Sequence, residues 1–382
     1  MSGRVEAVRE GSDAILLIPD VEMVNTSERG PKIVRMMRDR HEVVGLRPTW
    51  DRLLYDPRRA KWPRVLLYAL DKAILGWRGL LLARRHRVRV VFCESAHHAI
   101  AGLIVARVLG VRCVWDSHGN GKLFYESLRK GRLWVRLIAT LEKFVGKRVD
   151  DLITVSPADA AAYAEMGLPP SKIHMIPSCV TLADVDSIVG PFRPDGEGNT
   201  GPPVLVFFGS FGYEPNREAL EFINDVLAPH LERQGLVCEI RIAGRDIPQI
   251  DYHRFVRPLG FVPDIYSCIR SASLSIVPVR RGVGILVKVL DSMAVGTPVV
   301  LFEFGARGIP GIRHGVHAYV AATEEEFLRY VEEALRHPEA NRGIATEARR
   351  LIERGYEWDS YKDDLDAILR GSGTRALEAG AT

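Results

Sequence analysis

Short apolar runs alternate with amphipathic stretches along most of this 382-residue chain. The runs are rich in valine and isoleucine and are apolar at consecutive positions, which is typical of strands buried on both faces of a sheet. In the first half of the chain they lie at 13–20, 42–46, 88–95, 111–119, 151–156 and 172–178. In the second half they lie at 203–210, 236–244, 273–280 and 297–303. Helical patterns such as 98–110 and 217–231 separate them, so we predict an α/β fold with parallel, doubly wound sheets.

The composition changes near the middle of the chain, where residues 187–203 carry several Pro and Gly and no apolar period. Such a segment predicts a linker, and a length of about 150 residues per domain also favours two domains. We therefore predict two Rossmann-like domains, 1–186 and 204–356, whose strands face a shared cleft with their carboxyl ends. A final amphipathic helix is predicted at 357–372, packing back toward the N-terminal domain, followed by a frayed tail at 373–382.

The composition narrows the class of protein. No run reaches the ~20 uninterrupted apolar residues of a membrane-spanning helix, and the N-terminus lacks a basic-then-apolar signal segment. The five cysteines are scattered and never spaced as CxxC, which argues against a disulfide framework and a structural zinc site. We therefore expect a cytoplasmic protein.

The net charge of +4 is unevenly distributed. Residues 58–89 contain ten Lys or Arg against one acid, Asp71, and a second basic stretch lies at 122–148. Such segments suit an anionic membrane surface, which would make the protein peripheral on the inner face of the membrane. They equally suit helix faces whose arginine stems cover apolar surface. Nucleic acid is not expected, because neither stretch accompanies a nucleic-acid-binding motif.

The most informative segment is 277–310, where a buried strand ends at Val279 and a turn with two glycines precedes a helix capped by Gly296. The two turn glycines are Gly282 and Gly284. A helix that starts at such a turn offers free backbone N–H groups and the positive end of its dipole, which together form an anion site.

Lys288 lies in the first turn and a half of this helix, and Asp291 and Ser292 follow three and four residues later on the same face. The N–H groups and the ammonium suit a diphosphate, and the carboxylate suits two vicinal ribose hydroxyls. The spacing therefore favours a nucleoside diphosphate. An alternative is an ordinary surface ion pair between Lys288 and Asp291, which would contribute ~0.5 kcal/mol or less.

The pattern R-x-G-x-G-x-x-x-K-x-x-[ED]-x-M-A-x-G-x-P-V-V, followed by a Gly-Ala-x-Gly turn, resembles the donor site of retaining glycosyltransferases with the GT-B fold, glycosyltransferase family 4. The segments 207–222, 259–279 and 153–180 resemble other parts of the same family. The matching residues of the pattern are Arg280, Gly282, Gly284, Lys288, Asp291, Met293, Ala294, Gly296, Pro298, Val299, Val300, Gly305, Ala306 and Gly308.

The resemblance implies a role for particular residues. His118, after the strand at 111–119, would sit beside the donor sugar, and Lys288 and Arg280 would stabilise the leaving diphosphate. A loop histidine that only caps a turn is the other interpretation of His118. Gly30 would lie on the acceptor side. The implied donor-binding residues are Gly209, Ser210, Phe261, Val262, Gly282, Gly284, Lys288, Asp291 and Ser292.

The resemblance also implies a reaction: a hexose moves with retention from a UDP- or GDP-sugar to a glycan or lipid-linked acceptor. The acceptor attacks from the face that the diphosphate leaves, and the leaving phosphate takes the acceptor's proton. The reaction then needs no protein nucleophile, no metal and no cofactor beyond the nucleotide-sugar substrate. Catalysis would rest on positioning and on stabilisation of the developing charge.

The chain departs from the family pattern at several positions. Val283 and Asp291 stand where the family often has two glutamates, and Leu286 replaces the usual extra lysine. These departures keep open a catalytically silent homologue that binds a nucleotide sugar and partners an active transferase. A nucleotide-sugar epimerase on the same fold is a further alternative, although its acid–base carboxylates cannot be identified in the sequence.

Other short motifs carry less weight. The Asp184-Val-Asp186 sequence resembles a metal-binding DxD, but it precedes the linker and is interpreted as a turn. His97 and His98 follow Ser95 and are expected to cap the next helix rather than to line a cleft. No GxGxxG follows the first strand and no GxSxG is present, so the sequence favours neither NAD binding nor serine hydrolase chemistry.

Overall fold

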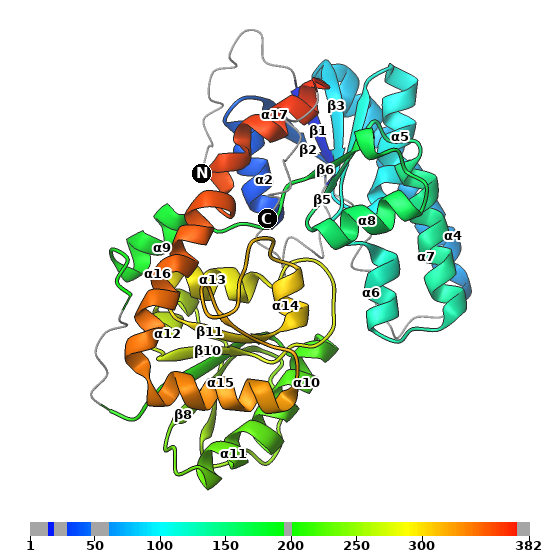
Figure 1. The fold of residues 1–382 in the computed structure, drawn as a ribbon. Helices are drawn as coiled ribbons and strands as arrows, with labels where there is room; N and C mark the ends of the chain where they lie inside the picture. Colours follow the sequence, from blue (N-terminus) through cyan, green and yellow to red (C-terminus); the bar gives the residue numbers. More distant parts are fainter. Residues whose placement is uncertain (1–13, 19–28, 47–60, 195–200, 373–382) are drawn as a thin grey trace, which may run out of the picture. The chain divides into compact units, whose positions relative to one another are not determined.

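The structure is a computed structural model that describes residues 14–18, 29–46, 61–194 and 201–372 (Figure 1). The chain divides into two compact units. Unit 1 comprises the chain up to Ile176 together with the segment from Tyr361, and unit 2 comprises Pro177–Ser360. Each unit contains one parallel sheet, so the predicted pair of doubly wound α/β sheets is confirmed.

The sheet of unit 1 has six strands in the order β2-β1-β3-β4-β5-β6, and all neighbours are parallel. The central strands β1, β4 and β5 are almost wholly buried, as their consecutive apolar residues predict. The strands are β1 (Ala14–Ile18), β2 (Glu42–Gly45), β3 (Val88–Cys93), β4 (Arg112–Asp116), β5 (Asp151–Thr154) and β6 (Ile173–Met175).

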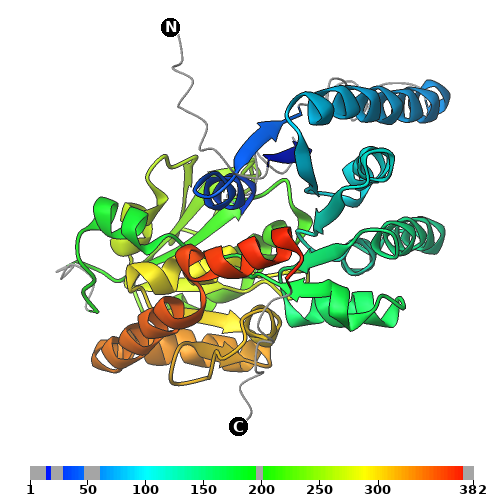
Figure 2. The ribbon, with the colours of Figure 1, turned by 90° about the horizontal axis from the view of Figure 1, so that it is seen from above.

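The helices of unit 1 cover both faces of this sheet (Figure 2). Right-handed crossovers place the helices that lead from β2 to β6 on one face and α2, which leads from β1 to β2, on the other. The helices are α2 (Arg29–Arg38), α4 (Lys61–Arg85), α5 (Ala96–Leu109), α6 (Gly121–Ser127), α7 (Arg132–Gly146), α8 (Pro157–Glu165) and α17 (Lys362–Arg370), with a 3-10 turn at Pro170–Lys172.

Side-chain caps fix two of the unit 1 helices directly after strands. Ser95 accepts from the backbone N–H of His98 at the start of α5, and its Oγ lies 2.9 Å from His98 Nδ1. Ser156 plays the same part at α8, where Pro157 occupies the first helical position. Capping residues of this kind satisfy backbone donors that the first turn leaves open.

The C-terminal helix α17 belongs to unit 1 and packs against α2. His41 Nε2 lies 2.7 Å from Asp366 Oδ1, and Arg40 pairs with Asp363 at 2.5 Å. Arg112 of β4 donates to the carbonyl of Ile368 at 3.3 Å. Polar contacts at the rim and the buried apolar face of α17 together hold this helix on unit 1.

Unit 2 contains a second six-stranded parallel sheet in the order β12-β11-β10-β7-β8-β9. Its central strands are buried on both faces, and its edge strands are short or partly exposed. The strands are β7 (Val204–Ser210), β8 (Glu239–Arg245), β9 (Val256–Gly260), β10 (Leu274–Val277), β11 (Val299–Phe302) and β12 (Tyr319–Ala321).

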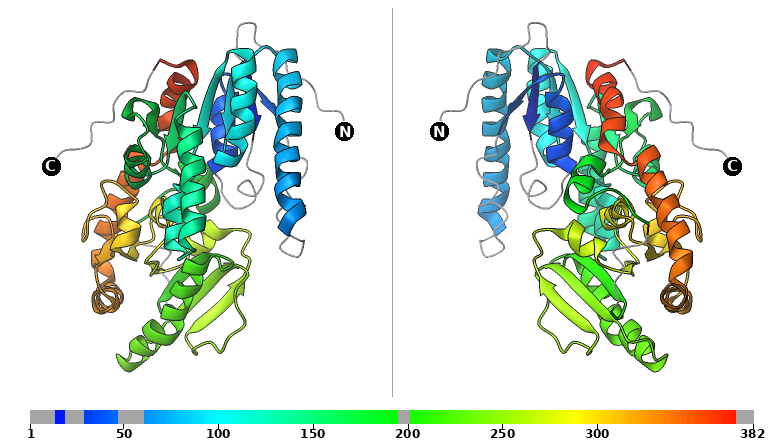
Figure 3. Two further views of the ribbon diagram at one scale, coloured as in Figure 1. Left: turned by 90° about the vertical axis from the view of Figure 1, so that its right-hand side faces the viewer. Right: turned by 90° about the vertical axis from the view of Figure 1, so that its left-hand side faces the viewer.

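Helices also flank both faces of the unit 2 sheet, and Figure 3 shows α10 and α11 joined end to end through a π-helical turn. The helices of unit 2 are α9 (Leu182–Val189), α10 (Glu214–Phe222), α11 (Ala228–Arg233), α12 (Ile265–Arg270), α13 (Val287–Val295), α14 (Glu303–Arg307), α15 (Glu324–Arg336) and α16 (Pro338–Gly355). The π-helical turn is Ile223–Leu227, and a 3-10 turn follows α16 at Trp358–Tyr361.

The chain passes from unit 1 to unit 2 between Ile176 and Pro177, ahead of the segment 187–203 that composition singles out. The interpretation of the Asp184–Asp186 motif as a turn is wrong, because these residues lie within α9. Val185 is fully buried in the core of unit 2, and Asp186 forms an ion pair at 2.7 Å with Arg349 of α16. Burial of one apolar side chain and pairing of one carboxylate therefore anchor this helix.

Candidate functional site

In unit 2, two glycines bring the backbones of neighbouring strands β7 and β8 together where the strands end. Gly209 has φ of 154°, and a Cβ there would lie 2.9 Å from Asn216 Nδ2 and 3.0 Å from Lys288 Nζ. Gly244 has φ of 147°, and a Cβ there would lie 1.7 Å from the carbonyl oxygen of Gly209. Only glycine therefore leaves room for Lys288 and Asn216 to lie over the end of β7.

Lys288 of α13 is half-buried, and its ammonium donates to Asn216 Oδ1 at 2.8 Å. Asn216 Nδ2 in turn donates to the carbonyl of Ser210 at 2.7 Å, and Lys288 Nζ lies 4.2 Å from the ring centroid of Phe207. Burial lowers the pKa of Lys288 to about 7. In the part of the chain that the structure describes, no carboxylate pairs with Lys288, so the surface ion pair with Asp291 is not formed.

The turn before α13 is built around two glycines with positive φ, 147° at Gly282 and 69° at Gly284. A Cβ on Gly282 would lie 2.8 Å from the hydroxyl of Tyr213, and one on Gly308 would lie 2.6 Å from the carbonyl oxygen of Gly284. Helix α13 begins after Leu286, and this N-cap residue makes no side-chain capping bond. Its first backbone N–H groups and its dipole thus supply an anion-binding end beside Lys288.

The side chains of the adjacent residues Asp291 and Ser292 have different surroundings in the structure. Tyr266 of α12 donates to Asp291 Oδ1 at 3.4 Å, and Asp291 is half-buried. Ser292 is fully buried; its hydroxyl donates to the carbonyl of Lys288 at 2.8 Å, and its Oγ also lies 2.8 Å from Ser275 Oγ of β10. Ser292 therefore faces the sheet, because α13 packs this side against β10, and it is not brought to the surface that carries Lys288.

The other predicted donor residues lie on neighbouring loops of unit 2. Phe261 follows β9, is 61% exposed, and has the guanidinium of Arg245 4.9 Å from its ring centroid. Val262 packs against the core of the unit. Arg280 pairs with Glu324 at 2.5 Å. Its guanidinium lies over the rings of Phe222 and Phe302 at 4.9 and 4.6 Å, so its described contacts are not with Lys288.

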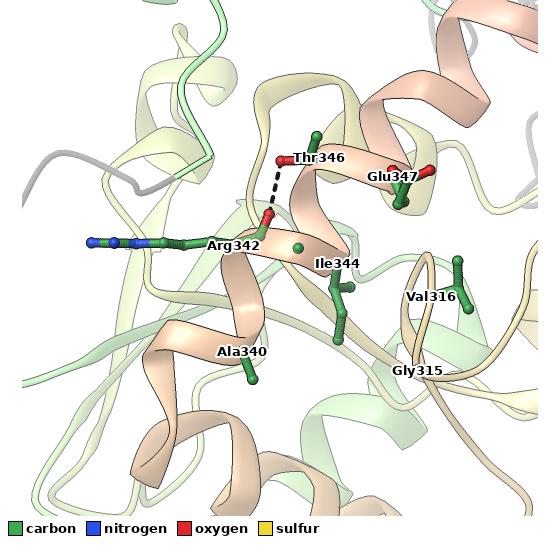
Figure 4. A pocket seen from close by; sticks show the side chains of 8 residues that line it. Gly315, Val316, Ala340, Arg342, Ile344, Thr346 and Glu347 are labelled. Atoms are coloured by element: carbon green, nitrogen blue, oxygen red, sulfur yellow. Dashed lines mark hydrogen bonds between the residues drawn. The ribbon is translucent and has the colours of Figure 1, made fainter.

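Arg280 also lines a cavity of about 430 Å³ at the carboxyl end of β11. Its lining is Arg280, Phe302, Glu303, Phe304, Arg307, Ala322, Thr323 and Glu324. A second cavity of about 450 Å³ lies between α16 and the turn at Gly315–Val316, and Figure 4 shows Arg342 pointing away from the other labelled side chains there. This second cavity contains none of the predicted site residues.

In unit 1, His118 lies just after β4, and its side chain is 8% exposed. Its Nε2 lies 3.3 Å from Asp116 Oδ2, and Asp116 accepts two bonds from Arg29, at 2.7 and 3.1 Å. Arg29 also donates to the carbonyl of Ile176 at 2.9 Å. Burial alone would raise the pKa of Asp116, but Arg29 and His118 outweigh it and lower the value to about 2. Asp116 is therefore ionised, and its carboxylate lies beside one nitrogen of the His118 ring.

A buried carboxylate on α7 holds the loop that carries His118. Glu142 accepts from the backbone N–H groups of Gly121 and Lys122 at 2.8 and 3.2 Å, and from the hydroxyl of Tyr163 at 2.9 Å. The Tyr163 hydroxyl also lies 2.7 Å from Ser117 Oγ. Burial raises the pKa of Glu142, against the effect of these hydrogen bonds.

A second buried carboxylate acts one residue earlier in the same loop. Asp159 of α8 accepts from the backbone N–H of Asn120 at 2.7 Å and from Ser156 Oγ at 2.5 Å, and burial raises its pKa. The sequence analysis missed both carboxylates. Glu142 could have been found as an acid on the apolar face of an otherwise basic helix, and Asp159 as a partner of a Ser N-cap.

Gly30 lies buried at the start of α2. A Cβ at Gly30 would lie 2.8 Å from Oε1 of Glu94, a buried residue that directly follows β3. The rest of the loop that follows β1 lies outside the described residues. Among the described residues, no group of three or more His, Cys, Asp or Glu could hold a metal ion. The expectation that the reaction needs no metal stays a prediction.

Two family models match the chain, one in each half. Residues 18–179 match the model described as glycosyl transferase 4-like domain, and residues 202–337 match glycosyl transferases group 1. The two segments together cover most of the chain and correspond closely to the two sheets. A search of curated protein sequences gave no match to this chain.

Solved structures share the fold at low sequence identity. Anabaena HepE in complex with UDP-glucose is 14% identical, with a TM-score of 0.65, covering 94% of this chain and 99% of that one. Sucrose-phosphate synthase from Thermosynechococcus elongatus is 13% identical, with a TM-score of 0.70 and the same coverage. The α,α-trehalose 6-phosphate synthase from Burkholderia multivorans is 13% identical, with a TM-score of 0.67, covering 94% of this chain and 97% of that one.

Proposed function

This chain belongs to the GT4-type glycosyltransferases of the GT-B fold, and from that premise we propose that it moves a hexose from a UDP- or GDP-sugar to a glycan or lipid-linked acceptor with retention. The main support for the donor site is the position of Lys288. Its hydrogen bond to Asn216 places the ammonium over the end of β7, beside the N-terminus of α13. An ammonium, free helix N–H groups and a glycine turn are the groups that a diphosphate needs.

The remaining donor contacts are proposed around this centre. Asp291, held by Tyr266, would accept from the ribose hydroxyls, and the exposed ring of Phe261 under Arg245 would stack on the base. The HepE structure is a complex with UDP-glucose, which makes a uridine diphosphate sugar the first donor to test.

Unit 1 would supply His118 beside the donor sugar. Nε2 of His118 faces the ionised Asp116, so Nδ1 is the ring nitrogen that would contact a sugar hydroxyl. Lys288 and the N-terminus of α13 would stabilise charge on the leaving diphosphate, whose oxygen takes the acceptor's proton. These residues would position the donor sugar and stabilise the charge on the diphosphate, and none of them would form a covalent bond to the sugar.

The first experiment is a calorimetric titration of the full chain with UDP-glucose, GDP-mannose and ADP-glucose, in magnesium and in EDTA. We expect one nucleotide sugar to bind, equally well in EDTA, and Lys288→Met to weaken it at least tenfold while the melting temperature is retained. Unchanged affinity in Lys288→Met would remove Lys288 from the site. Arg233→Met, at an exposed arginine on α11, is the matched control.

Turnover is tested separately with the donor that binds and a mixture of glycan and lipid-linked acceptors. Retention predicts that the anomeric configuration of the donor persists in the product, as measured by NMR. Binding without turnover in every acceptor mixture would identify a silent homologue. Isomerised nucleotide sugar in the absence of acceptor would identify an epimerase.

A further inference from the structure

Helix α7 in unit 1 leaves an apolar stripe in solvent. Leu133, Leu137 and Phe144 are 84%, 57% and 47% exposed, respectively. A helix turns about 100° per residue, so these three side chains lie within about 40° of one another. The opposite side of α7, with Val135 and Ile138, is buried. The stripe is therefore an unpartnered face rather than scattered exposed residues.

Basic side chains run alongside this stripe. Arg132, Arg136 and Lys143 on α7 are exposed, as is Lys147, the helical C-cap residue directly after Gly146, and the four lie within about 60° of one another around the helix axis. Within the described part of the chain, no carboxylate forms an ion pair with any of these four. Arg148 lies on the other side of the stripe, with its guanidinium 3.8 Å from the ring centroid of Phe144.

Basic residues are also exposed in the turn before α7, and few acidic residues lie near them. Arg129 and Lys130 are exposed in this turn. The acid of α7 itself, Glu142, is buried and bonded to the His118 loop, and Glu126 of α6 lies 3.7 Å from Lys122. The exposed side of α7 thus combines an apolar stripe with unneutralised positive charge. In Figure 2, α7 lies in the row of helices that covers one face of the unit 1 sheet.

We propose that this face of α7 docks on an anionic lipid bilayer. Leu133, Leu137 and Phe144 would enter the boundary between headgroups and acyl chains, and the four cations would lie among the lipid phosphates. A second copy of the chain fits less well, because two such faces would bring cations against cations. Nucleic acid also fits less well, because it would leave the apolar stripe in water.

The attachment is peripheral, as none of the described helices has the length and apolarity to cross a bilayer. It does not depend on the proposed transfer reaction, because vesicle binding needs neither donor nor acceptor. Failure of the transfer assay therefore leaves this proposal untouched, and failure of vesicle binding leaves the donor site untouched.

The test is flotation of the full chain with vesicles of phosphatidylcholine alone or mixed with phosphatidylglycerol. We expect binding to the mixed vesicles only, weakened by salt. The triple variant Leu133→Ser/Leu137→Ser/Phe144→Ser should lower the partition coefficient at least tenfold. The charge variant Arg132→Gln/Arg136→Gln/Lys143→Gln/Lys147→Gln should do the same. All seven side chains are exposed, so the melting temperature should stay within a few degrees of that of the unmodified chain.

Matched controls come from unit 2. The apolar control is the variant Ile188→Ser/Val237→Ser/Ile250→Ser, which removes three exposed apolar side chains. The charge control removes four exposed arginines, Arg233, Arg313, Arg329 and Arg354. Both controls should bind like the unmodified chain. Absence of binding to phosphatidylglycerol vesicles, or equal losses in controls and α7 variants, would overturn the proposal. So would a dimer in solution that the α7 variants dissolve.

Discussion

Lys288 donates its hydrogen bond to Asn216, a residue that lies 72 positions earlier in the chain and on a different helix. The amide of Asn216 is fixed in turn by the carbonyl of Ser210, so the ammonium is held over the end of β7 without a carboxylate partner. Burial lowers the pKa of this ammonium to about 7, and an anion placed beside it would restore the charge.

Donor binding should therefore weaken as the pH rises. UDP-glucose keeps its charge between pH 6 and pH 9, whereas Lys288, with a pKa of about 7, loses its proton across this range. The dissociation constant should be level below pH 7 and should rise by up to about tenfold per pH unit above it. Calorimetry at several pH values measures this slope. Lys288→Met should give a flat profile, and a flat profile in the unmodified chain would contradict the assignment.

Replacing Asn216 by Asp should move this pH dependence. A carboxylate 2.8 Å from the ammonium raises the pKa of Lys288, so the rise of the dissociation constant should begin well above pH 7. The same carboxylate competes with the diphosphate, so affinity at pH 6 should fall. Asn216→Leu, which supplies no charge, serves as the comparison. An unchanged pH profile in Asn216→Asp would mean that Lys288 does not control it.

The buried carboxylates of unit 1 should affect turnover rather than donor affinity. Glu142→Gln keeps the size of the side chain but weakens the bonds to the backbone of Gly121 and Lys122, which carry the His118 loop. We expect kcat to fall about tenfold to a hundredfold with a nearly unchanged donor dissociation constant, because displacement of a positioned group is costly. Glu126→Gln, at an exposed acid on α6, is the control. Equal losses in the two variants would speak against a positioning role.

The glycines at the ends of β7 and β8 should be intolerant of substitution. Gly244→Ala would place a methyl group 1.7 Å from the carbonyl oxygen of Gly209, at a φ of 147°. We expect a loss of about 3 kcal/mol or more, and weaker donor binding because Gly209 must move. Gly343→Ala is the matched control, since nothing lies within 4 Å of its Cβ position in α16, and it should stabilise by about 1 kcal/mol. Thermal melts of both variants measure the contrast.

The pattern of apolar residues did not predict strands β9 and β12, for the same reason in both cases. β9 and β12 are the two edges of the unit 2 sheet. β9 carries Pro258 and has only one buried residue, and β12 is three residues long. An edge strand is covered on fewer sides and need not be apolar at consecutive positions, so it lacks the pattern that reveals the central strands.

The sequence by itself determined the alternation of buried strands and helices, the glycine turn before α13 and the position of Lys288 in its first turns. Those features depend on local periodicity and on backbone conformations that only glycine adopts readily. Tertiary structure decided the partners: Asn216 for Lys288, Arg29 for Asp116, and Glu142 and Asp159 for the His118 loop. It also turned Ser292 into the sheet. These contacts join residues far apart in the chain, and crossovers between parallel strands, which leave no local pattern, bring them together.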